Sequence, residues 1–434
     1  MNVLWYKRDL RIRDHEALQF ASRTGQVLPI YVAEPSIWRK PDLSIRHFRF
    51  VLESLKELQK EWEERGGHLL FFIGEMDEAL RLIYEFYGPF QLFTHKENET
   101  YEAEERNQLV REWMEAHELP FYEITQFDGQ SHRFNQMWKE YISKDPLEPS
   151  ERITCPGYEP KEFFTSIEPL YSFHVKGEPV SYGQVGGEDK AHEMLPNINL
   201  DSLSAYLAWG NLSIRQIIKE VENQPKIRSL MKLYAKSLVE QDVPSLLSNQ
   251  TDLDPVRKKT EEAYYERWFL GRTGIPIIDA AMRCARKTGM MENSFKEMIV
   301  SFLCCTMLWD WRRPALDLAK LLIDYRPEVH YTMIRKAAGE SGKQSIPHAV
   351  KTGRKEDPNG EFIKRYVPEL NHLPQKYIHE PWKYPGFFQL NYPAPFVDIE
   401  KANRNTANVL KGLVSNDETK QEESPTGQMK FDIY

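Results

Sequence analysis

The chain has 434 residues, with a hydrophobic content of 41% and an aromatic content of 12%. These fractions are typical of folded proteins and exclude an intrinsically disordered chain. Domains usually hold about 100 to 200 residues, so this length predicts two domains. The formal net charge of −8 argues against a uniformly basic nucleic-acid-binding protein, although a local cluster of Lys and Arg can still contact phosphates.

The cysteines and the apolar segments exclude several further classes. Cys155, Cys284, Cys304 and Cys305 lack a C-x-x-C spacing, so neither a zinc site nor an iron–sulfur cluster is predicted. No run of about 18 apolar residues predicts a membrane span, and the apolar run before Lys7 is too short for a secretion signal. We therefore expect a cytoplasmic protein without membrane contact and without a bound metal.

The first third of the chain alternates strands with helices. Short apolar runs predict four strands, at 3–6, 27–32, 68–73 and 91–94. Helical periodicity predicts helices between them, among them 44–64 and 102–118. This alternation is typical of a doubly wound parallel sheet, so residues 1–130 are expected to form an α/β domain.

A proline-bearing segment separates this part from a helical one. Six prolines between about residues 143 and 187 disfavour regular elements, so residues 131–188 are expected to connect two domains. Residues 189–393 are predicted to form an all-α domain, with helices at 202–221, 227–240, 260–269, 277–287, 294–311 and 315–324. The extension 394–434 ends in a polar segment from about Ser415 to Lys430, which we expect to be disordered.

Two local patterns in the helical part allow both a structural and a functional interpretation. Gly271, Gly274 and Pro276 are typical of a loop that enters a helix, but the amides of this loop and Arg272 could also hold a phosphate. Tryptophans are concentrated in the same part, at 209, 268, 309 and 311. They either fill the core or relay electrons to a redox cofactor. By themselves these residues support only an α/β plus α protein.

Residues 271–283 resemble the signature G-x-T-G-x-P-x-V-D-A-x-M-R of the DNA photolyase/cryptochrome family. Further matching blocks follow in the family's order, at 301–303, 310–312, 323–324, 357–363, 367–370 and 378–382. Upstream, residues 5–14 are similar to the W-F-R-x-D-L-R-x-x-D start of the antenna-binding domain, and residues 203–216 resemble the L-S-P-Y-L-x-x-G-x-x-S-x-R-Q helix. The resemblance covers nearly the whole chain to Trp382, and the chain is identified as a divergent member.

The resemblance implies FAD in the helical domain and an antenna chromophore in the N-terminal domain. In a photolyase of this family, light excites the reduced flavin, and an electron passes to a flipped pyrimidine lesion and returns. Asn293 aligns with a flavin-contacting Asn, Asp324 with the first Asp of D-x-D, and Lys296 with a flavin-pairing Arg. The expected cofactor-binding residues are Ser202, Ser204, Arg272, Asn293, Lys296, Asp324, Arg326 and His330.

Several of these positions depart from the family's pattern on the cofactor side. The T-S-x-L-S motif that grips the FAD phosphates reads Leu200, Asp201, Ser202, Leu203 and Ser204 here, so two hydroxyls are missing and a carboxylate is added. Negative charge repels a pyrophosphate, so weak FAD binding is expected. The second Asp of D-x-D is an arginine at position 326, and the Asn beside flavin N5 is a histidine at position 330.

The substrate side departs as well. Lys336 replaces the Trp that stacks on the lesion, and we take it as the substrate-side residue. The flavin-proximal Trp of the family's electron-transfer chain aligns with Ile334 here. Trp311 is therefore the one residue that we name as an electron relay. No catalytic residue is assigned. The E-L-x-W-R helix has no counterpart in residues 229–240.

Two functions follow from the resemblance. The first is a blue-light, FAD-dependent deoxyribodipyrimidine photolyase, a carbon–carbon lyase that repairs damaged DNA. The second is a cryptochrome-like light sensor that signals through a protein partner, or a member with weakened or lost FAD use. The missing lesion contacts, Ile334 and the acidic net charge favour the second. We expect weak or absent thymine-dimer repair and a monomeric protein.

Overall fold

The computed structural model describes residues 1–97, 100–125, 133–149, 151–157, 166–198, 200–221, 223–240, 254–258, 261–339 and 346–409. The polar segment from Ser415 to Lys430 lies outside the described residues. The chain divides into two compact units. The first comprises Met1–Asn249, Cys284–Asn293 and Arg312–Met333, and the second comprises Gln250–Arg283, Ser294–Trp311 and Ile334–Tyr434.

The first unit contains a five-stranded parallel sheet. Its strands are β1 (Asn2–Tyr6), β2 (Val27–Ala33), β3 (Leu70–Ile73), β4 (Gln91–His95) and β5 (Phe121–Ile124), in the order β3-β2-β1-β4-β5. The chain therefore winds outward from β1 first through β2 and β3, and then on the other side through β4 and β5. This reversal between β1 and β4 is the point at which doubly wound sheets bind ligands, outside the carboxyl ends of the strands.

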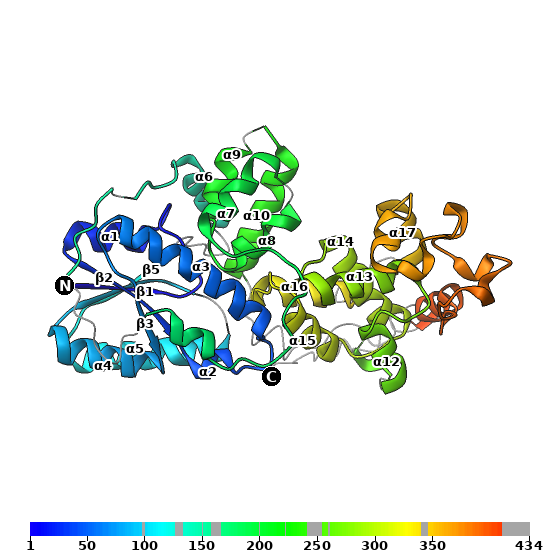
Figure 1. The fold of residues 1–434 in the computed structure, drawn as a ribbon, viewed down its shortest axis with the longest axis horizontal. Helices are drawn as coiled ribbons and strands as arrows, with labels where there is room; N and C mark the ends of the chain where they lie inside the picture. Colours follow the sequence, from blue (N-terminus) through cyan, green and yellow to red (C-terminus); the bar gives the residue numbers. More distant parts are fainter. Residues whose placement is uncertain are drawn as a thin grey trace, which may run out of the picture. The chain divides into compact units, whose positions relative to one another are not determined.

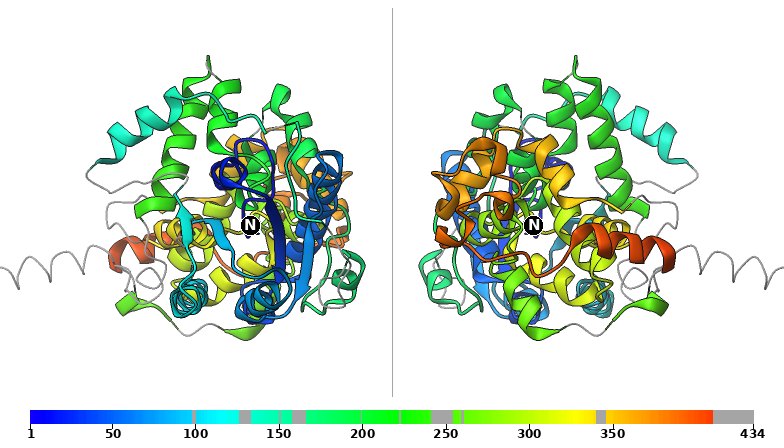
Figure 2. Two further views of the ribbon diagram at one scale, coloured as in Figure 1. Left: turned by 90° about the vertical axis from the view of Figure 1, so that its left-hand side faces the viewer. Right: turned by 90° about the vertical axis from the view of Figure 1, so that its right-hand side faces the viewer.

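Helices cover both faces of this sheet (Figures 1 and 2). One face carries α1 (Glu16–Thr24) and α3 (Ile45–Glu64), and the other carries α4 (Met76–Tyr87) and α5 (Tyr101–Ala116). The buried residues of β1 to β4 pack against apolar side chains of α4 and α5 in one core cluster. Because both faces are covered, β1 and β2 are buried along their whole length. The four expected strands are confirmed, whereas β5, α1 and α4 had not been singled out.

The first unit contains further α-helices. A short one, α2 (Pro35–Trp38), lies between β2 and β3 in the chain, and the others follow the sheet: α6 (Phe134–Ser143), α7 (Glu188–Met194), α8 (Leu200–Ala208), α9 (Ile214–Glu220), α10 (Pro225–Glu240) and α15 (Arg312–Leu321). Two helices run across the boundary between the units, α13 (Pro276–Thr288) and α16 (Pro327–Ala337). The predicted continuous helix at 202–221 was wrong, because the chain turns between α8 and α9.

Gly210 makes that turn. Its φ is +71°, and a Cβ placed there would lie 2.2 Å from the carbonyl oxygen of Arg8. A residue with a side chain would therefore be strained and would also clash with the loop that follows β1. Close approach at this point lets α9 begin beside the carboxyl edge of the sheet.

The second unit is helical in its described part. It contains α12 (Glu262–Phe269), α14 (Asn293–Ser301, which begins at the boundary), α17 (Ala349–Glu356) and α18 (Glu361–Tyr366). The predicted helix at 294–311 ends early: a π-helical turn spans Phe302–Thr306, and Leu308 has a φ of +57°. The expected fold class, an α/β sheet domain followed by helices, is confirmed. Among the described residues, no helix is long and apolar enough to cross a membrane.

Candidate functional site

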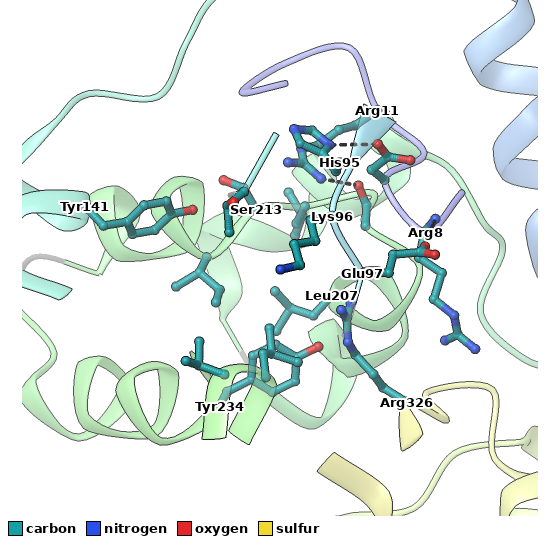
Figure 3. Close-up of a pocket in the computed structure, with 17 residues that line it drawn as sticks. Arg8, Arg11, His95, Lys96, Glu97, Tyr141, Leu207, Ser213, Tyr234 and Arg326 are labelled. Atoms are coloured by element: carbon teal, nitrogen blue, oxygen red, sulfur yellow. Dashed lines mark hydrogen bonds and ion pairs between the residues drawn. The ribbon is translucent and has the colours of Figure 1, made fainter. Parts of the chain in front are cut away.

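A pocket lies at the carboxyl edge of the sheet, entirely within the first unit. It is lined by the loop after β1, by Lys96 and Glu97 after β4, by Thr125 after β5, and by residues of α6, the α8–α9 turn and α10. Figure 3 shows Lys96 extending into the middle of the pocket, with Tyr141 on one side and Tyr234 and Arg326 on the other. The pocket has a cavity volume of about 80 Å³.

Asp9 and His95, which line this pocket, form a buried cluster with His15. Oδ2 of Asp9 lies 2.7 Å from Nδ1 of His95 and 3.0 Å from Nε2 of His15. The second nitrogen of each ring accepts a hydrogen bond from a backbone N–H. Leu18 donates to Nδ1 of His15 at 3.0 Å, and Ala17 donates to Nε2 of His95 at 3.3 Å. Each ring therefore carries its proton on the nitrogen that faces Asp9.

These protons distinguish the cluster from a metal site. A histidine that binds a metal uses a bare nitrogen and donates its second N–H to an acceptor, which is the reverse of the arrangement found here. Burial lowers the pKa of His95 to about 3 and also lowers the pKa of His15. Burial would raise the pKa of Asp9, but the hydrogen bonds from the two histidines hold it well below its usual value. The cluster is thus a neutral-histidine, charged-aspartate triad that joins β1, β4 and the start of α1.

A second buried charge pair joins α9 to the same loop. Arg215 donates to the Asp14 carboxylate, with Nε 3.0 Å from Oδ1, and Asp14 also accepts from the Ser213 hydroxyl. Oδ1 of Asp14 accepts the backbone N–H of Leu147 at 2.9 Å. Asp14 has a φ of +54°, a conformation that Asp adopts more readily than most residues. Nearby, Arg11 donates to the carbonyl oxygen of Gly210 at 2.9 Å.

The residues predicted for the phosphate side of the cofactor lie on α8 and at the start of α14. Asp201 Oδ1 accepts the backbone N–H of Asn293 at 3.2 Å. The hydroxyl of Ser204 donates to the carbonyl oxygen of Asp201 at 2.8 Å. The carbonyl oxygen of Ser202 accepts a hydrogen bond from Gln184. The structure therefore brings Asp201 and Asn293 together.

Asp324 and Arg326 lie between α15 and α16, and His330 lies in the first turns of α16. Arg326 Nε lies 3.6 Å from Glu328, and His330 Nε2 lies 2.9 Å from the carbonyl oxygen of Ala315. Arg326 also lines the pocket of Figure 3, beside Tyr234. Asp324 is half-buried, whereas Glu328 and His330 are buried.

The Gly-rich loop of the second unit binds a residue of its own chain. Asp279 on α13 accepts the N–H of Thr273 at 2.7 Å, the hydroxyl of Thr273 at 2.6 Å and the N–H of Gly274 at 3.0 Å. Tyr392 donates to the same carboxylate. These two amides are used inside the protein, as the loop-to-helix interpretation expects. Arg272 itself is exposed.

The other predicted residues of the second unit lie on α14 and α16 and beside them. Lys296 is buried on α14. Lys336 Nζ lies 3.7 Å from Oε1 of Glu297, and both side chains are about half exposed. Trp311 is fully buried, with the Arg335 guanidinium 5.6 Å from the centre of its ring. Ile334, which lies on α16 with Arg335, is completely buried.

Comparisons with known proteins place both parts of the chain in one group. Residues 2–130 match the family model described as DNA photolyase, and residues 229–412 match the FAD binding domain of DNA photolyase. The deoxyribodipyrimidine photo-lyase of Escherichia coli is 27% identical, over 93% of this chain and 97% of that protein. Cryptochrome-1 of Aedes aegypti is 25% identical, over 95% and 92%.

This chain belongs to the DNA photolyase/cryptochrome family. Solved structures agree with the family's fold. A bacterial class III photolyase from Agrobacterium tumefaciens superimposes with a TM-score of 0.82 at 22% identity, over 95% of this chain and 98% of that one. An archaeal photolyase from Sulfolobus tokodaii, solved with two FAD molecules, gives 0.81 at 23% identity, over 96% and 100%.

The family's cofactor is FAD. The residues that we predicted for its phosphate side make hydrogen bonds within the chain. The Asp201 carboxylate adds a negative charge at a position where the family has a hydroxyl, and it already accepts the amide of Asn293. The Ser204 hydroxyl donates to a backbone carbonyl. The two donors predicted to face a pyrophosphate, the amide of Asn293 and the hydroxyl of Ser204, are thus already hydrogen-bonded within this photolyase/cryptochrome-family chain.

Sequence reasoning missed three residues that line the pocket, His95, Tyr141 and Tyr234, and also His15 of the buried cluster. Asp9 lies in the D-L-R motif, which is a usable signal for the position of the loop after β1. His95 and Lys96 follow the apolar run of β4, and residues that follow parallel strands gather at one edge of a sheet. That rule would have identified them in this photolyase/cryptochrome-family protein, whereas Tyr234 on an ordinary amphipathic helix offered no signal.

Proposed function

We propose that this protein is a cryptochrome-like flavoprotein in which thymine-dimer repair is weak or absent. The observation that carries the proposal is Lys336, which replaces the lesion-stacking Trp and lies 3.7 Å from Glu297. Flipping a dimer out of the stack costs a few kcal/mol, and aromatic stacking returns about 1 to 3 kcal/mol per base. A lysine held by a carboxylate offers no ring, so that compensation is lost.

The surroundings of Trp311 support the same proposal. The residue that would relay an electron from it to the flavin is the aliphatic Ile334, which has no accessible oxidised state. The Arg335 guanidinium lies over the Trp311 ring, and a positive charge there opposes loss of an electron from the indole. We therefore expect light-driven reduction of the flavin through Trp311 to be slow.

Repair of DNA as a deoxyribodipyrimidine photolyase is the second candidate function. It is favoured by relatives that carry this name and align over more than nine-tenths of both chains. Under this function the partner is damaged DNA, and under the first it is a signalling protein. Lys336, when released from Glu297, would contact a DNA phosphate, which predicts salt-sensitive and non-specific DNA binding.

The cofactor residues belong to this proposal. We propose Ser202, Ser204, Arg272, Asn293, Lys296, Asp324, Arg326 and His330 as the residues nearest the FAD, bound with lowered affinity because of Asp201. We further propose an antenna chromophore in the first unit, a monomeric protein and a cytoplasmic location. The division at residues 130, 188 and 393 is part of the same proposal.

Two measurements test the function. The absorption spectrum of the purified protein should show flavin bands once FAD is supplied, because no amino acid absorbs blue light. Chemically reduced, FAD-loaded protein is then illuminated with single-stranded DNA that contains a thymine dimer, and thymine recovery is followed. We expect little recovery, and efficient repair would reject the cryptochrome-like function in favour of the photolyase.

A further inference from the structure

Tyr325 and Asp42 of the first unit form a buried, hydrogen-bonded pair. Tyr325, which lies between α15 and α16, donates its phenolic O–H to Oδ2 of Asp42 at 2.6 Å. Only 1% of the surface of Tyr325 and 7% of that of Asp42 are exposed. A base takes a proton directly from a hydroxyl within about 2.6 to 3.2 Å. The geometry therefore permits proton transfer from the tyrosine to the aspartate.

The phenol of this pair keeps its proton at rest. Burial and the negative charge of Asp42 both raise the pKa of Tyr325 well above its usual value. The second oxygen of Asp42, Oδ1, has no hydrogen-bond partner among the described residues, so the carboxylate still has capacity as an acceptor. Removal of an electron from a phenol makes it a strong acid, and a carboxylate at hydrogen-bond distance accepts the released proton. The pair therefore couples the loss of an electron from Tyr325 to the transfer of its proton.

The aromatic rings around Tyr325 decide where an electron vacancy stays. The ring of His330 lies 5.1 Å from that of Tyr325, edge to face, and the ring of His47 lies 5.9 Å away on another element. His47 in turn lies 5.9 Å from Trp209. The Arg8 guanidinium lies 4.1 Å from the centre of the Trp209 ring, and its positive charge opposes the loss of an electron from that indole. An oxidised Tyr325 is therefore not readily reduced through Trp209.

Tyr325 lies among the residues that we propose nearest the FAD. Asp324 and Arg326 flank it in the chain, and His330, which we expect beside flavin N5, contacts its ring. The family's relay is expected to be interrupted at Ile334, which aligns with the flavin-proximal Trp. An oxidisable side chain next to His330 offers the flavin a different electron donor.

We propose that Tyr325 is a redox-active residue that reduces the light-excited flavin, with Asp42 as its proton acceptor. This inference rests on the proposed function as a flavoprotein. Tyr325 gives one electron to the oxidised, excited flavin, its O–H bond breaks, and the proton passes to Oδ2 of Asp42. Tyr325 becomes a neutral radical, Asp42 becomes a neutral carboxylic acid, and the flavin is reduced by one electron.

Blue-light reduction of the flavin in the FAD-loaded, full-length protein tests the inference, followed without DNA as the loss of oxidised-flavin absorption. Tyr325→Phe should slow the reduction on the order of tenfold, because Phe keeps the ring but has no proton to release. Asp42→Asn should slow it about threefold, because an amide oxygen accepts a hydrogen bond but is a far weaker base. Deuterated water should slow the wild type and not this variant. The matched control is Tyr6→Phe, a buried tyrosine of β1 whose oxygen accepts the N–H of Trp62, and it should have no effect.

Electron paramagnetic resonance of the illuminated and frozen protein identifies the radical. We expect a neutral tyrosyl signal in the wild type, narrowed when the protein is made with ring-deuterated tyrosine, and absent from Tyr325→Phe. Trp311→Phe should leave the signal and the rate unchanged. Flavin that binds but is not reduced by light, an unchanged rate in Tyr325→Phe, or loss of the reduction in Trp311→Phe would overturn this inference and leave the flavoprotein intact. A protein without flavin bands in the presence of FAD would overturn the proposed function together with this inference.

Discussion

Lys336 Nζ lies 3.7 Å from Glu297 Oε1. We expect Lys336 to stand where photolyases of this family stack a tryptophan on the lesion. Both side chains are about half exposed, so water screens the pair and it contributes little to stability. Replacement of Lys336 is therefore a test of function rather than of folding.

Lys336→Trp should restore part of the lesion recognition. Stacking of about 1 to 3 kcal/mol corresponds to a preference for dimer-containing over undamaged DNA on the order of 5- to 150-fold. The two dissociation constants are measured by fluorescence anisotropy with labelled oligonucleotides. Lys355→Trp on α17 is the control and should leave the ratio near that of the wild type. A wild-type protein that already strongly prefers dimers would contradict the assigned role of Lys336.

Asp201→Ser should tighten FAD binding. Removal of one negative charge near the expected pyrophosphate gains about 1 kcal/mol in a solvated setting, which is roughly a fivefold lower dissociation constant. Quenching of flavin fluorescence on binding gives the constant directly. Asp77→Ser, exposed on α4, is the matched control. Equal constants for wild type and Asp201→Ser would show that α8 does not touch the phosphates.

The buried histidines should make the protein less stable in acid. Burial lowers the pKa of His95 to about 3, whereas the unfolded value is about 6.5. The unfolded state thus binds more protons between these values, so the free energy of unfolding falls as the pH drops from about 6.5 toward 3. His95→Gln should reduce this slope by up to about 1.4 kcal/mol per pH unit. Urea unfolding at a series of pH values measures it, and identical slopes would refute the triad.

Arg215→Met should destabilise the first unit by about 3 to 5 kcal/mol, because it leaves the buried Asp14 carboxylate without its main partner. The double change Arg215→Met with Asp14→Asn removes the stranded charge and should recover part of the loss. Asn tolerates the positive φ of residue 14, so the backbone is not strained. Chemical denaturation gives both values. A double variant that is less stable than the single one would show that the charge itself is not the cause.

The family motifs and the apolar patterns are local, and they determined the fold class and the family. Alternating strands and helices in residues 1–130 are sufficient to predict a parallel sheet, because each amphipathic element must bury its apolar face against its neighbours. The run 271–283 was recognisable because its residues are consecutive. The roles expected of Lys336 and Ile334 likewise rest on their place between the matching blocks at 323–324 and 357–363.

Tertiary structure decided how charges and hydrogen bonds are satisfied. Asp9 meets His95 across 86 residues of sequence, and Arg215 meets Asp14 across 201, since parallel strands bring the ends of distant segments to one edge. The helix expected at 202–221 breaks at Gly210 because the loop after β1 approaches there. The pocket with Lys96 and Tyr234 depends on β4 and α10 together. The periodicity of apolar residues carries no information about such pairings. It indicates which face of a helix or strand is buried, but not which other element packs against that face.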